Sequence, residues 1–187
     1  MTIEEPKFSL VLKEGAFELR DYAPCIVAEV AVTGDQQAAG GKGFRPLANY
    51  IFGANAKSPH VAMATPVGNG AGGEKIAMTA PVTLIGAPTG HWLVRFTMPS
   101  AYALADLPIP NDPQVQLRSM PAARYAVLRF SGLTSVAKVS EQASKLTALV
   151  RARGLVPSGR VSLARYNPPW TLWFMRRNEV MFPVKLG

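Results

Sequence analysis

The sequence has little of the material from which covalent cross-links and metal clusters are built. Its 187 residues include one cysteine, Cys25, and two histidines, His60 and His91. A single cysteine excludes a disulfide within the chain and a zinc site made of several cysteines. No apolar run reaches the ~18 residues of a membrane-spanning helix. The first ten residues show no signal-peptide pattern, so we expect a cytoplasmic protein unless a longer precursor carries a signal.

Acidic residues are scarce as well, and the chain is therefore basic. Twenty Lys and Arg against twelve Asp and Glu give a net charge of +8. Such a surface either serves solubility or attracts an anion such as a phosphate, a membrane surface or a carboxylate-bearing small molecule. The densest basic group contains no long run and no nucleic-acid motif, so we expect no nucleic-acid partner: Arg151, Arg153, Arg160, Arg165, Arg176 and Arg177.

Motifs of common enzymes are also missing. The chain has no Gly-x-Ser-x-Gly elbow, no phosphate-binding loop, no dinucleotide fingerprint and no His-Glu-x-x-His. The glycine-rich run at 68–73 does not lead from a strand into a helix, which favours a flexible loop. We therefore expect a protein that is not an enzyme.

The sequence does contain many short strand patterns, separated by turns rich in its 16 glycines and 16 prolines. The expected strands cover 8–13, 17–22, 25–33, 76–85, 91–98, 114–119, 125–130, 161–166 and 179–184. We expect 38–43 to be a glycine-rich stretch, 54–75 a long loop and 99–113 a proline-rich crossover.

Two helices are expected, one in each half of the chain. In 44–53, Phe44, Leu47, Ala48 and Ile51 share one face, and Pro46 fits the first turn. The second helix covers 134–153, with Thr134 or Ser135 as its cap and Gly154 at its end.

The order strand–strand–helix–strand–strand thus occurs twice. Neither half has enough apolar surface to be stable alone, so we expect one domain over 1–187. Its halves would be 8–98 and 114–184, joined by the crossover. Two such units would close into a barrel-like α+β fold.

Several residues are candidates for a ligand site. His60 is either an exposed loop residue or an axial iron ligand. Met63 and Met78 occur in the near-repeats VAMATPV and IAMTAPV, and they either pack in the core or line an apolar ligand pocket. Trp170 and Trp173 follow two prolines, so they either pack in the core or form an aromatic wall for a planar ligand.

Two adjacent arginines precede a carboxylate in Arg176-Arg177-Asn178-Glu179. Arginine matches a carboxylate with two parallel hydrogen bonds. The pair therefore either binds Glu179 and other acids within the protein or holds a carboxylate of a ligand.

Taken together, these segments resemble the SOUL heme-binding protein family over roughly residues 6–184. The resemblance rests on the order and spacing of seven pieces: FELRDY at 17–22, GF through YIFGAN at 43–55, KIAMTAPV at 75–82, VRFTMP at 94–99, FSG at 130–132, YNPPW at 166–170 and RRNEV at 176–180.

The resemblance implies a distorted antiparallel β-barrel built from two pseudo-symmetric ββαββ halves, each with one helix. It also implies heme or a related porphyrin in a shallow hydrophobic groove between the first helix, 44–52, and the loop 166–173. Arg45, Asn49 and Phe52 lie on the outer face of that helix. Arg45 would meet a propionate and Phe52 the macrocycle, while the loop supplies Tyr166, Trp170 and Trp173.

The stretch 57–73 lengthens a link that is usually short in this family, and it brings in His60 and Met63. By resemblance, the protein is a bacterial-type member that binds a tetrapyrrole reversibly, to buffer, deliver or sense it. One alternative is an interaction module that uses its basic surface, with a protein partner that the sequence does not identify. A further alternative is an enzyme that modifies a tetrapyrrole, for instance by removing its iron.

Overall fold

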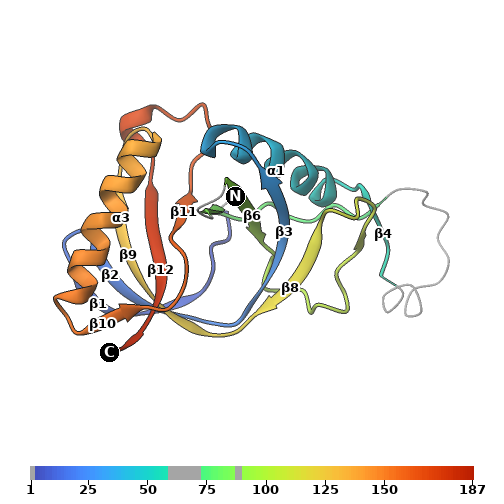
Figure 1. Ribbon diagram of the computed structural model, residues 1–187. Helices are drawn as coiled ribbons and strands as arrows, with labels where there is room; N and C mark the ends of the chain where they lie inside the picture. The colour runs from blue at the N-terminus through green and yellow to red at the C-terminus, as the bar shows by residue number, and fades with distance from the viewer. Residues whose placement is uncertain (1–2, 59–72, 87–89) are drawn as a thin grey trace.

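Two helices and a strongly curled antiparallel sheet make up the fold in a computed structural model, which describes residues 3–58, 73–86 and 90–187 (Figure 1). In chain order, the elements are β1 Phe8–Glu14, β2 Phe17–Tyr22, β3 Cys25–Thr33, α1 Gln36–Ile51, β4 Asn55–Ala56, β5 Val82–Gly86, β6 His91–Thr97, β7 Ile109–Pro110, β8 Gln116–Met120, β9 Ala123–Phe130, α3 Val136–Arg151, β10 Leu155–Pro157, β11 Ser162–Arg165, the 3-10 turn η1 Trp173–Met175 and β12 Asn178–Leu186.

The strand order explains the two-fold character of the fold. The strands lie in the order β1-β2-β9-β12-β11-β5-β6-β3-β8, and β10 pairs with β12. The series β2-β3-α1-β5-β6 is followed by the equivalent series β8-β9-α3-β11-β12. The first strand of each series pairs with the other series, because β2 joins β9 and β8 joins β3. The expected α+β fold, a distorted barrel of two ββαββ halves, is confirmed.

Alternation along the strands gives the sheet two different faces. One face is apolar and is covered by the helices: α1 packs on β3 and β6, and α3 packs on β9, β10 and β12. Its two main clusters are centred on Leu47 and Val94 under α1 and on Leu146 and Phe182 under α3. The opposite, concave face carries most of the buried charged residues, and we call it the inner face.

Helix α1 begins eight residues earlier than expected. The Asp35 side chain caps it by accepting a hydrogen bond from the amide of Ala38 at 2.7 Å. The glycine-rich stretch is therefore helical, and Pro46 lies inside the helix instead of in its first turn. At position 43, glycine is required by close packing, because a Cβ there would lie 2.3 Å from Val94.

Other expectations about local structure also change. The strand expected from residue 76 begins only at Val82, because the amides before it bond elsewhere: Ile76 donates to Ile51 and Ala80 to Glu4. Of the residues predicted to share one helical face, Leu47 and Ile51 are buried, whereas Phe44 is 39% exposed. Helix α3 begins after its predicted cap Ser135, and Gly154 follows its end with a positive φ. Within the described residues, neither helix is long and apolar enough to cross a bilayer.

Candidate functional site

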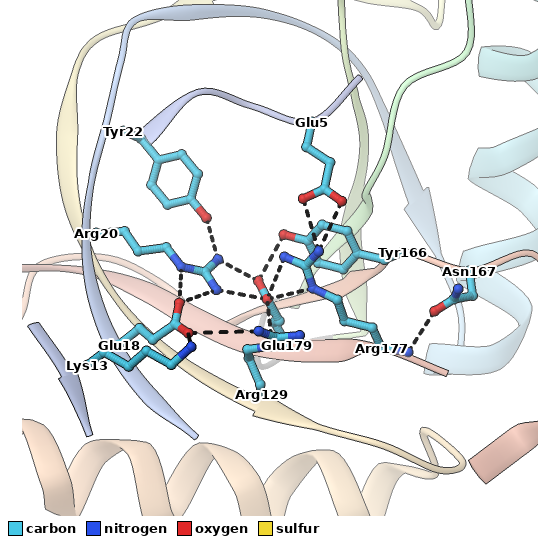
Figure 2. A network of polar contacts seen from close by, with 10 residues as sticks. All are labelled: Glu5, Lys13, Glu18, Arg20, Tyr22, Arg129, Tyr166, Asn167, Arg177 and Glu179. Atoms are coloured by element: carbon cyan, nitrogen blue, oxygen red, sulfur yellow. Dashed lines mark hydrogen bonds and ion pairs between the residues drawn. The ribbon is translucent and has the colours of Figure 1, made fainter. Parts of the chain in front are cut away.

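A buried carboxylate, Glu179 on β12, is the centre of a polar network on the inner face (Figure 2). The Arg20 guanidinium donates to both of its oxygens at 2.8 and 2.9 Å, and the Tyr166 hydroxyl donates at 2.8 Å. Arg20 is 1% exposed and also donates to Glu18 and Tyr22. Every strong charge in this network therefore has a partner within the protein.

Burial alone would raise the pKa of Glu179. The hydrogen bonds and positive charges of Arg20 and Arg177, together with the Tyr166 hydrogen bond, outweigh burial and hold this pKa below its usual value. Glu179 is therefore ionised at neutral pH.

Arg177 connects this network to the N-terminal segment. It donates to Glu179 at 3.0 Å and to both oxygens of Glu5 at 3.0 Å, and its guanidinium lies 3.7 Å from the centre of the Tyr166 ring. Of the two interpretations of the arginine pair, internal pairing holds for Arg177. Arg176 donates to the carbonyls of Thr171 at 2.8 Å and Pro169 at 2.5 Å, which are loop groups without charge.

The loop between β11 and β12, residues 166–177, is closed at its base and apolar at its tip. At the base, the amide of Tyr166 donates to the carbonyl of Arg177, and the amide of Arg177 donates to the Asn167 side chain. Trp170 is 83% exposed and Trp173 is 58% exposed. Three further large apolar side chains are exposed on the same loop: Leu172, Phe174 and Met175. We call the exposed residues 170–175 the aromatic loop.

Large apolar side chains that are exposed side by side on a loop do not stabilise the core, and such patches usually mark a binding surface. The Arg176 guanidinium holds the backbone of this loop through its two carbonyl contacts. The rings of Trp173 and Phe174 pack edge to face with centroids 5.6 Å apart. The aromatic loop thus offers a pre-formed apolar surface to a flat ligand.

One row of residues crosses the helix-covered face of the sheet beside the base of this loop. Cross-strand pairing places Phe130, Asn178, Arg165, Val82 and Phe96 side by side, in that order. Directly opposite residues of antiparallel strands point to the same face. The row ends beneath α1, where Phe44 packs edge to face on Phe96 at 5.4 Å. Arg165 is thus the charged member of a row whose other four residues are neutral.

The structure separates the residues predicted for the ligand. Arg45, Asn49 and Phe52 are exposed on α1, as the predicted outer face requires, and Met78 is 42% exposed. Trp170 and Trp173 lie on the aromatic loop, whereas Tyr166 points to the inner face and bonds to Glu179. His60 and Met63 lie outside the described residues. The proposed contacts of all these residues with a ligand stay predictions.

A cleft of about 240 Å³ lies elsewhere, between the N-terminal segment and the start of β3. Its lining includes Glu4, Cys25, Met98 and Tyr102. Cys25 is half-buried there, and burial raises the pKa of its thiol. Over residues 3–58, 73–86 and 90–187, no group of three or more His, Cys, Asp or Glu side chains could hold a metal ion.

Sequence reasoning missed two features of this region. Residues Leu172, Phe174 and Met175 belong to the same exposed surface as the predicted tryptophans, and an apolar run directly after two prolines was the available signal. In the sequence, Arg165 stands out only as one member of a basic group. Its alternation with Leu163 in the strand pattern would have placed a charge on the helix-covered face.

Comparisons with known proteins agree with the resemblance seen in the sequence. A model of the SOUL heme-binding protein family matches residues 3–183. No curated protein matches the chain in sequence. Among solved structures, the C-terminal domain of EcmrR is similar with a TM-score of 0.63 and 13% identity, covering 91% of this chain and 98% of that one. A chain described as a hydrolase from Listeria innocua reaches a TM-score of 0.60 at 10% identity, covering 94% of both chains. At such identities, these two likenesses show a shared fold alone.

Proposed function

Because the chain belongs to the SOUL heme-binding protein family, we propose that it binds heme or a related tetrapyrrole reversibly at the aromatic loop, without turnover. The observation that carries this proposal is the 83% exposure of Trp170 beside the exposed side chains of Trp173 and Phe174. A porphyrin is a flat apolar ring with acidic side chains, so it needs a flat apolar surface and nearby cations.

The residues present fit such a group. The aromatic loop supplies indole and phenyl rings for the macrocycle, and α1 presents Phe44 and Phe52, which are partly exposed. A guanidinium with a buried, unpaired nitrogen, that of Arg165, lies at the base of the same loop. Heme would bring its iron to this surface, while the residues described here would bind and orient the ring.

The positions of the acid–base groups in the described residues also favour binding over catalysis. Tyr166 and Glu179 lie at the base of the loop, but Tyr166 donates to Glu179, and Glu179 also accepts from Arg20 on the inner face. An enzyme that removes iron needs groups that can deliver protons to the pyrrole nitrogens. The aromatic loop itself carries none, so we favour buffering, delivery or sensing over turnover.

The test is a titration of the purified protein with hemin, followed in the Soret region at low and at high salt. We expect a saturable shift of the Soret peak that persists at high salt, because apolar contact supplies most of the affinity. The absence of saturable binding would contradict the proposal and favour an interaction module. A second readout, release of iron from bound hemin over hours, would reveal turnover.

A further inference from the structure

Arg165 is partly buried, and it differs from the fully buried Arg20 in having no counter-charge. Its Nε atom is buried and has no hydrogen-bond partner, and within the described residues no carboxylate forms an ion pair with its guanidinium. The neighbours in its row are the neutral residues Asn178 and Val82. The Asn178 amide is itself used, because it donates to the carbonyl of Gly132 at 3.0 Å.

The surroundings of this guanidinium make the missing partner costly. Burial lowers the pKa of Arg165, and the positive charge of the nearby Arg176 lowers it further. An ionised group taken out of water without a partner destabilises the fold. A guanidinium without a counter-charge in such surroundings is better explained by binding of an anionic ligand than by packing.

The guanidinium of Arg165 lies against α1 at Gly40. A Cβ added at Gly40 would lie 3.5 Å from the Nη1 atom of Arg165, so the guanidinium lies directly under this turn of the helix. One turn further along α1, Phe44 covers Phe96 in the same row of the sheet. Arg165 therefore lies between the N-terminal half of α1 and the loop that carries Trp170 and Trp173.

We propose that Arg165, assisted by Arg176, is the anion-binding site that receives a carboxylate of the tetrapyrrole lying on the aromatic loop. This inference rests on the proposed function and specifies its ligand class: tetrapyrroles with free carboxylates, in preference to esterified or neutral ones. A carboxylate can accept N–H groups at the terminal end of the Arg165 guanidinium, which gives this charge the partner that it lacks within the described residues. Arg45 is exposed on α1 and faces solvent, so a carboxylate bound there stays hydrated and gains less.

The experiment measures the dissociation constants of hemin and of iron(III) protoporphyrin IX dimethyl ester for four proteins: wild type, Arg165→Met, Arg165→Lys and Arg45→Gln. Wild type should bind hemin about tenfold or more tightly than the diester, since a charge-assisted hydrogen bond is lost with the ester. Arg165→Met should abolish this preference, Arg165→Lys should restore part of it, and Arg45→Gln should keep most of it.

A second readout is the melting temperature of the protein without porphyrin. Removal of an unpaired buried charge should raise it in Arg165→Met by roughly 2–4 °C. An unchanged ester preference in Arg165→Met would overturn this inference and leave the proposed function intact. Loss of the preference in Arg45→Gln alone would assign the carboxylate to Arg45. Wild type that binds neither porphyrin would overturn both proposals.

Discussion

At the scale of single residues, the partners of an arginine decide what it does. Arg20 is fully buried and bonds to two glutamates and a tyrosine, whereas Arg165 is partly buried and its Nε has no partner. The first arginine links β2 to β12, the strands on either side of β9, through Glu179. The second is a local cost to the fold, which a ligand carboxylate would remove.

The Glu179 network gives a direct prediction for stability. Replacement Glu179→Gln keeps the size of the side chain but removes the charge that faces Arg20. We expect it to lower the free energy of unfolding by about 3–5 kcal/mol, because a buried ion pair that loses one partner leaves an uncompensated charge. Urea denaturation measures this difference.

The matched control is Asp21→Asn. Asp21 also pairs with an arginine, Arg124, but both side chains are more than 40% exposed. We expect almost no change there, because exposed pairs are hydrated and screened. Equal losses in the two variants would show that burial of Glu179 is not what makes its pair important.

At the scale of elements, the docking of α1 depends on the glycine run at 40–43. Gly43 faces Val94, and a Cβ there would overlap the valine, whereas Gly41 has nothing within 4 Å of its added Cβ. Gly43→Ala should therefore destabilise the protein by roughly 1–3 kcal/mol through overpacking. Gly41→Ala should stabilise it by about 0.5–1 kcal/mol, because alanine favours the helix. Urea unfolding of both variants tests these two predictions. Changes of the same sign in the free energy of unfolding would contradict this docking of α1.

The same helix shows where sequence reasoning reached its limit. The apolar spacing of Leu47 and Ile51 predicted the C-terminal half of α1, because that half buries large side chains. The N-terminal half buries Gly43, which carries no periodic signal, and its cap Asp35 precedes glycines that usually indicate a loop. The order of elements along the chain and the presence of one helix in each half were predictable, but the close contact that explains Gly43 required coordinates.

The candidate site was predictable to a similar extent. Two prolines before Trp170 indicated a stiff aromatic loop, and the structure shows this loop with its tryptophans exposed. Composition and spacing alone do not decide whether these residues pack in the core or form an exposed wall. Likewise, the alternation that places Tyr166 on the inner face and Arg165 under α1 depends on one residue of register, which pairing with β12 and β5 decides.

At the scale of the whole molecule, titrating groups limit the pH range of stability. The Glu179 carboxyl has a pKa below its usual value of 4.5 in the folded state. The ionised carboxylate therefore stabilises the fold above about pH 4.5, and this stabilisation is lost as the pH falls through the lowered pKa of the folded state. At the alkaline side, the hydrogen bond to Glu74 and burial raise the pKa of Tyr102 from 10.0 to about 12. The protonated Tyr102 hydroxyl therefore stabilises the fold fully below pH 10, and this stabilisation is lost as the pH rises through about 12.

We therefore expect the urea midpoint to be highest between about pH 5 and 9 and to fall on both sides. Tyr102→Phe should reduce the fall of the urea midpoint at alkaline pH, and Glu179→Gln should reduce its fall at acid pH. A midpoint that keeps rising from pH 9 to 12 would contradict the assignment of Tyr102 as a neutral hydrogen-bond donor.

The central claim is that this member of the SOUL family binds heme through its aromatic loop. The most direct measurement compares the hemin dissociation constant of Trp170→Ala/Trp173→Ala with that of Leu186→Ala. Leu186 is 81% exposed and lies at the far end of β12, which begins at Asn178 beside the loop. We predict that the double variant binds hemin at least tenfold more weakly, because each indole contributes more than 1 kcal/mol of apolar contact, while Leu186→Ala binds like wild type. Equal affinities in all three proteins would contradict the claim.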